Sequence, residues 1–254
     1  MPGEERHGAR THLCSPWRAW ALHAFTAFGG VVGLLALIAL FNDQPRAAIY
    51  WLLFALVIDG LDGPLARAWG VAEVLPNIDG FVLDVVVDFF TAIVPLAFLW
   101  RLDMLPAALE LPVVGFTLIC TALWYARRDL ESADHWFNGF PAQWNLIVPT
   151  LLLLGTDQMS NAIVIAALGA LQLTSVKFVH PMRVVELRRV TLTITVLWLV
   201  AIATLVEVHG PLPWGWKALL LVGPAYYAAI TIRRTRADED IVAAARARVA
   251  DSLA

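Results

Sequence analysis

Long apolar stretches recur along the whole chain, and short segments rich in charged residues separate them. A helix needs about 20 apolar residues to cross the hydrocarbon core of a bilayer. Eight stretches approach this length, at residues 17–41, 47–68, 79–100, 105–126, 141–154, 160–176, 189–208 and 214–232. The fifth is short, which leaves a tilted or half-inserted helix open as an alternative. The pattern predicts an all-α, polytopic integral membrane protein, a bundle of about eight transmembrane helices.

The composition agrees with this class and excludes others. The chain is 59% hydrophobic and 15% charged, whereas a soluble domain carries about 25% charged residues. The net charge of -3 provides no basic surface for nucleic acid,. Membrane lipids are therefore the expected surroundings. We divide the chain into an N-terminal segment (1–16), a membrane domain (17–232) and a C-terminal tail (233–254).

The basic residues orient the predicted helices. With the N-terminus in the cytoplasm, fifteen of the 18 Lys and Arg residues fall on the inner side. Only Arg46, Arg101 and Lys217 fall on the outer side. This asymmetry follows the positive-inside rule and supports an even number of spans with both termini cytoplasmic. The second stretch then ends, and the third begins, on the cytoplasmic side, which is the side that holds nucleotides.

Four aspartates interrupt the second and third apolar stretches, at Asp59, Asp62, Asp84 and Asp88. A charged carboxylate at membrane depth costs about 3 kcal/mol. Four of them together need a compensating partner, and divalent cations bound by oxygen ligands are the natural one. The competing interpretations are aspartates that face cytoplasmic water and a proton relay, but a relay does not need the glycines that accompany the acids.

Helical spacing gathers these acids on two faces. The first face carries Asp59, Asp62, Gly63, Ala66 and Arg67, and the second carries Gly80, Asp84 and Asp88,. If the faces oppose each other, the carboxylates can bridge two metal ions, and the arginine can hold a phosphate oxygen. This set of groups favours phosphoryl transfer from a nucleotide-activated substrate.

The pattern D-x2-D-G-x2-A-R…G-x3-D-x3-D resembles the signature of the CDP-alcohol phosphotransferase family, which displaces CMP from CDP-linked alcohols. Twelve residues, rather than the usual eight, separate Arg67 from Gly80. This spacing resembles the bacterial phosphatidylcholine synthase branch. So do the sequences at residues 62–67, 73–77, 139–145 and 177–184. The resemblance extends over about residues 17–232.

The resemblance implies an enzyme of the bacterial inner membrane that converts CDP-diacylglycerol and choline to phosphatidylcholine and CMP with two Mn²⁺ or Mg²⁺ ions. By position, the metal ligands would be Asp59, Asp62, Asp84 and Asp88. The CDP site would comprise Asp59, Asp62, Gly63, Ala66, Arg67, Gly80 and Asp84. Asp88 would be the general base that takes the proton of the attacking hydroxyl. The sequence leaves a homodimer open.

A quaternary ammonium is best held by aromatic faces with a carboxylate nearby. The loop after the fourth stretch interleaves such groups, and its candidates for binding choline are Tyr125, Glu131, Asp134, Trp136 and Trp144. Ordinary interfacial aromatic residues are the alternative. His180 and Arg183 are candidates for the diphosphate or for lipid headgroups. His23, with Thr26 one turn further on, is a candidate border of the site.

Two alternative functions remain open from the sequence. A related synthase could use serine, glycerol 3-phosphate or inositol, but those acceptors favour arginine over aromatic residues near the site. A cation transporter could use the carboxylates as an ion site. Transporters often carry inverted repeats, whereas all the clustered acids here lie in one predicted helix pair.

The topology can be tested by labelling single cysteines in a cysteine-free background. Positions near Gly70, Ser132 and Ala237 should react from the cytoplasmic side, and positions near Asn42 and Leu212 from the outside, because of the asymmetry of the basic residues,. Labelling of the Gly70 loop from the outside would contradict the topology and a site that draws on cytoplasmic nucleotides.

Overall fold

The computed structural model describes residues 13–253, with side chains up to residue 238. The helices are α1 (Pro16–Phe41), α2 (Pro45–Trp69), α3 (Val71–Val74), α4 (Gly80–Arg101), α5 (Glu110–Tyr125), α6 (Trp144–Leu154), α7 (Gln158–Gln172), α8 (Arg188–Leu205) and α9 (Trp214–Leu253). Two short strands, β1 (Trp136–Asn138) and β2 (Lys177–Val179), pair antiparallel. The prediction of a mostly helical chain is confirmed, and each predicted apolar stretch overlaps one helix.

Several of these helices suit a bilayer. Within the described residues, α1, α2, α4 and α8 are long and apolar enough to cross a membrane. Helices α5, α6 and α7 are apolar but shorter. These features indicate an integral membrane protein. The predicted number of about eight spans stays a prediction.

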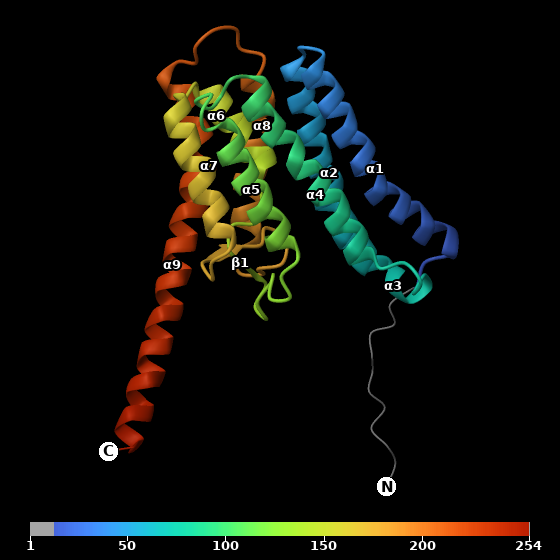
Figure 1. Cartoon of the computed structure of the whole chain (residues 1–254). Coiled ribbons are helices and arrows are strands. Elements are labelled where there is room, and N and C mark those ends of the chain that lie inside the picture. Colours follow the sequence, from blue (N-terminus) through green and yellow to red (C-terminus); the bar gives the residue numbers. More distant parts are fainter. Residues whose placement is uncertain (1–12, 254) are drawn as a thin grey trace.

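The helices run alternately up and down in one bundle (Figure 1). Helices α1, α2 and α4 lie together on one side, and α5 to α9 lie on the other. Helices α2 and α4 both contact α6, which joins the two groups. The beginning of α1 and the end of α9 lie at the same end of the bundle as α3, β1 and β2. We call this the ribbon end.

Close packing joins α1 to α4. A Cβ atom on Gly29 would lie 2.9 Å from Cγ1 of Val87, and one on Gly33 would lie 3.1 Å from Cγ2 of Thr91. Membrane helices approach closely where small residues face their neighbour. The two glycines, one turn apart, therefore bring α1 against the part of α4 that carries Asp88.

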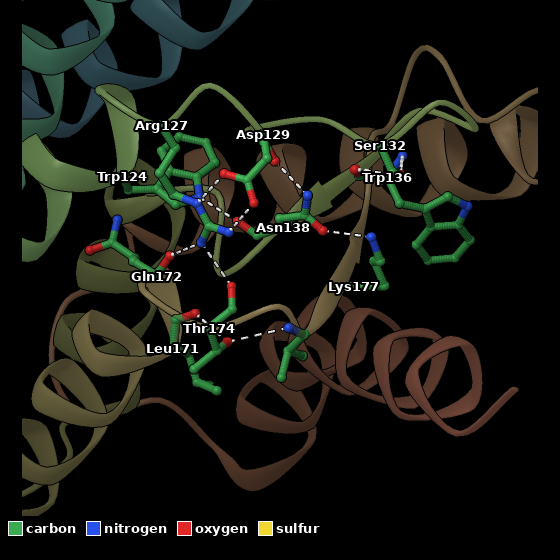
Figure 2. Close-up of polar contacts among 11 residues, drawn as sticks. Trp124, Arg127, Asp129, Ser132, Trp136, Asn138, Leu171, Gln172, Thr174 and Lys177 are labelled. Carbon is green, nitrogen blue, oxygen red and sulfur yellow. Dashed lines mark hydrogen bonds and ion pairs between the residues drawn. The ribbon is translucent and has the colours of Figure 1, made fainter. Parts of the chain in front are cut away.

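Hydrogen bonds tie the loops together at the ribbon end (Figure 2). The guanidinium of Arg127 donates to the carbonyl oxygens of Gln172 and Thr174, at 3.1 and 2.8 Å. It also makes two parallel bonds to the carboxylate of Asp129, at 2.9 and 2.8 Å. Arg127 therefore fixes the loop after α5 to the end of α7, next to the pairing of β1 with β2.

A sharply bent segment, residues 139–145, leads from β1 into α6, and we call it the α6 entry turn. Gly139 has a φ of +85°, and a Cβ atom there would lie 2.2 Å from the carbonyl oxygen of Gln172. Ala142 also has a positive φ, +52°. Residues other than glycine rarely adopt this conformation. The side chain of Trp144 is fully buried, and its Nε1 donates to Oγ1 of Thr121 at 3.0 Å. The turn is thus fixed at both ends.

The substitution Gly139→Ala should destabilise the protein by about 2–4 kcal/mol, because it adds backbone strain and a steric overlap with Gln172,. Thermal unfolding in detergent measures the change. Gly155→Ala is the matched control, because Gly155 has a φ of +62° but open space around it. That change should cost only about 1–2 kcal/mol. Equal losses in both variants would contradict the steric argument.

Candidate metal centre

Three aspartates from two helices meet inside the bundle. Asp59 lies on α2, and Asp84 and Asp88 lie one turn apart on α4. One carboxylate oxygen from each lies within 4.8 Å of the other two. The packing of α2 and α4 against α1 holds these helices together, so the structure brings the two predicted acidic faces into contact.

Asp62, the fourth predicted ligand, is buried, with 6% of its surface exposed. It stands outside the group of three whose oxygens approach one another. It nevertheless lines the same cavity as the other three aspartates, together with Thr26 of α1. All four acids therefore share one internal space, and the predicted border residue Thr26 lies in it.

The donor set fits a hard divalent cation. Each of the three clustered residues offers carboxylate oxygen, and the group contains no sulfur or imidazole ligand within the described part of the chain. Mg²⁺ and similar ions prefer such oxygen ligands. Three carboxylates this close in an apolar helix pair are also costly without a cation. The predicted metal site is thus supported as a group of three aspartates.

Other residues of the predicted CDP site lie towards the ribbon end of α2 and α4. The guanidinium of Arg67 lies over Gly63, where a Cβ atom would come within 3.2 Å of Nη1. Gly80 opens α4 and faces the ring of His23, with Cε1 at 3.5 Å from the position of a Cβ atom. Ala66 packs in a small apolar cluster with α1 rather than lining either cavity at the aspartates.

His23 is buried and its Nε2 has no hydrogen-bond partner among the described residues. A buried polar atom without a partner is costly. Its position against Gly80 places it beside the motif.

His180 and Arg183 lie at the ribbon end, outside the membrane-spanning helices. The ring of His180 stacks on Phe137 at 4.8 Å, and its Nδ1 accepts a hydrogen bond from the N–H of Met182 at 3.2 Å. Burial lowers the pKa of His180 to about 4, with Glu131 opposing the shift and Arg183 and Arg67 adding to it. The imidazole is therefore neutral at pH 7, and Nε2 carries its proton. Arg183 forms an ion pair with Glu131.

Four of the five residues proposed for binding choline already have close partners within the protein. Asp134 pairs with Arg234 at 2.5 Å, and the same guanidinium covers the ring of Trp136 at 5.5 Å. Glu131 pairs with Arg183, and Trp144 is fully buried. These four groups are occupied by contacts within the protein.

Tyr125 alone of the five reaches the metal centre. It lines a second cavity, which it shares with Asp59 and Asp88. Gln143 and Asn145 of the α6 entry turn complete the polar lining of that cavity. Neither amide has a role that the sequence alone predicts, although both lie in the stretch 139–145 that carries the resemblance. Only the tertiary structure places that stretch beside α2 and α4.

The fold and the site define a helical integral membrane protein with an acidic centre suited to divalent cations, set between two membrane helices. Individual relatives, rather than a family model, define the family. No family model matches the chain.

Curated relatives do match. The chain is 38% identical over 220 residues to a phosphatidylcholine synthase of Pseudomonas aeruginosa, covering 86% of this chain and 92% of the relative. It is 34% identical over 213 residues to the phosphatidylcholine synthase of Rhizobium meliloti, covering 83% and 88%. For the phosphatidylcholine synthase of Bradyrhizobium diazoefficiens the identity is 38% over 183 residues, covering 72% and 68%. The chain belongs to the phosphatidylcholine synthase family.

Proposed function

We propose that this chain is a CDP-diacylglycerol–choline O-phosphatidyltransferase, which makes phosphatidylcholine and releases CMP. The observation that carries the proposal is the convergence of Asp59, Asp84 and Asp88 within a member of the phosphatidylcholine synthase family. The motif that contains these acids also supports membership of the wider CDP-alcohol phosphotransferase family.

Asp59, Asp84 and Asp88 would hold a divalent cation, and Asp62 would complete a site for two ions, Mn²⁺ or Mg²⁺. The shared cavity of the four acids supports this set. When bound, such ions neutralise the charge of the pyrophosphate and of the departing CMP.

Side chains of the protein carry out the other steps of the transfer. The choline oxygen forms a bond to the phosphorus of the phosphatidyl group, and the bond from that phosphorus to the CMP oxygen breaks, so CMP leaves with the electron pair. The carboxylate of Asp88 takes the hydroxyl proton. Arg67 holds the diphosphate, with Gly63 and Gly80 beside the nucleotide. Burial lowers the pKa of His180, and the charges of Arg183 and Arg67 both lower it further. This proximity to Arg67 supports a contact of His180 and Arg183 with the diphosphate or with lipid headgroups.

We place the protein in the bacterial inner membrane with about eight spans and with the ribbon end in the cytoplasm. The alternating helix directions in Figure 1 support an even number of crossings. Arg127, Lys177 and Arg183 lie at the ribbon end, whereas Arg46, Arg101 and Lys217 lie at the opposite helix ends. This distribution agrees with the positive-inside rule.

The proposed metal site can be tested by single substitutions. Asp59→Ala, Asp62→Ala and Asp84→Ala should each abolish transfer of radiolabelled choline to CDP-diacylglycerol, because the cation loses a ligand. EDTA should have the same effect, reversed by Mn²⁺ or Mg²⁺. Asp43→Ala is the control, because Asp43 is exposed and pairs with Arg101 at the opposite end of the bundle. Near-normal activity in a correctly inserted variant of Asp59, Asp62 or Asp84 would refute the two-ion site.

The role of Arg67 can be tested through Gly63. The substitution Gly63→Ala forces the guanidinium to move, because a Cβ atom would lie 3.2 Å from Nη1. We expect the KM for CDP-diacylglycerol to rise about 3- to 10-fold through a weakened charged hydrogen bond, and the KM for choline to stay unchanged. Gly60→Ala, on the same helix with open space around it, should change neither value. Identical effects of the two substitutions would argue against this role.

A further inference from the structure

The second cavity at the metal centre has a composition that selects among acceptors. Its polar lining consists of the carboxyl groups of Asp59 and Asp88, the hydroxyl groups of Thr91 and Tyr125, and the amides of Gln143 and Asn145. Among the lining residues, which all belong to the described part of the chain, none is a lysine or an arginine. A site for a phosphorylated or carboxylated acceptor needs such cations. The polar residues of this cavity instead carry carboxyl, hydroxyl and amide groups.

Asn145 has an unmet hydrogen-bonding requirement. Its side chain is 8% exposed, and its Oδ1 accepts no hydrogen bond from any described residue. Buried polar atoms in native proteins nearly always have a partner. Asn145 also lines the cavity, and a cationic or hydrogen-donating ligand bound there would satisfy this oxygen.

The backbone holds Asn145 in place independently of any ligand. The α6 entry turn is fixed by the N–H of Gly139, which donates to the carbonyl of Val176 at 2.8 Å, and by the buried Trp144. Ala142, with its positive φ, lies between these anchors and lines the cavity itself. Strained residues of this kind persist where the surrounding structure over-determines them, and they concentrate at binding sites.

The remaining walls suit a quaternary ammonium. The ring of Tyr125 makes edge contacts with Trp124 at 5.0 Å and with Phe89 at 6.2 Å, so aromatic neighbours fix its orientation. Aromatic faces attract cations that cannot donate hydrogen bonds. Ala55 and Ala92 add small apolar side chains that suit methyl groups.

We infer that Asn145 and Gln143, with the ring of Tyr125, form the pocket that binds the trimethylammonium group of the acceptor and sets its specificity. This inference rests on the proposed function, since it names the acceptor site of that reaction. The hydroxyl of the acceptor then points towards Asp88, on the same cavity. The unpartnered oxygen of Asn145 interacts with the cation, and Asn145 acts as a specificity-determining residue.

The test is the substitution Asn145→Leu, which keeps the approximate size of the side chain and removes the carbonyl. We expect the KM for choline to rise about tenfold or more and the KM for CDP-diacylglycerol to stay the same, because an interaction with a charged group is lost. Equilibrium binding of radiolabelled choline to the purified protein should weaken by the same factor. An unchanged KM and unchanged binding would overturn the inference.

Asn161→Leu provides the matched control. Asn161 is also a buried amide, but its Nδ2 donates to the carbonyl of Met104 at 2.9 Å. It lies near the start of α7, at the opposite end of the bundle from the α6 entry turn. Its loss should lower thermal stability and leave the KM for choline unchanged. If Asn145→Leu does not fold, Asn145→Ser replaces it. An unchanged choline KM in that variant would equally overturn the assignment.

A wild-type assay separates this inference from the proposed function. The unmodified protein is given CDP-diacylglycerol with choline, serine, glycerol 3-phosphate or inositol. If it forms no phosphatidylcholine, the proposed function fails, and the pocket assignment fails with it. If it forms phosphatidylcholine but Asn145→Leu behaves like wild type, only the pocket assignment fails.

Discussion

The mutual repulsion of carboxylates in an apolar setting is the constraint on which this structure depends. Asp59, Asp84 and Asp88 offer oxygens within 4.8 Å of one another inside a helical bundle. Such a group is stable only if the surrounding helices hold it together and a cation balances its charge. The tight contact of α1 with α4 at Gly29 and Gly33 holds α4, which carries Asp84 and Asp88, in place. The rest of the site is arranged around this group, with basic residues towards one end and neutral amides on the other wall.

This division separates two kinds of recognition. Arg67 lies in the last turn of α2, where it can meet anionic phosphates. The cavity beside Asp88 is lined by Tyr125, Gln143 and Asn145, which suit a cation. An anionic donor and a cationic acceptor would thus approach the same acids from surfaces of different charge. The enzyme would not need a lid to distinguish the donor from the acceptor, because the charges of the two surfaces are complementary to different substrates.

Much of this architecture could be predicted from the sequence. Apolar length located each helix, although α9 continues to Leu253, well beyond the predicted end at residue 232. Steps of three and four gathered the acids on two helix faces, which the structure brings together. The choline candidates show where such reasoning ends. Trp136 and Trp144 have the composition of a cation site, yet one lies under Arg234 and the other is fully buried. Composition cannot reveal which side chains already contact other groups of the folded protein. The contribution of Asn145 depends on a turn with two positive φ angles and on contacts between distant loops, which leave no periodic signal.

The pairing of β1 with β2 has a consequence for the biogenesis of the protein. The acidic half of the centre is complete in sequence once α4 ends at Arg101. The α6 entry turn, however, is anchored to Val176 and Gln172, and β1 has no partner until Lys177–Val179 has been synthesised. A nascent chain would therefore insert its cation-binding helices well before the opposite wall could close. The opposite wall could close only after α7 and β2 had been synthesised, so the order of translation would place the pairing of the acidic helices before completion of the pocket.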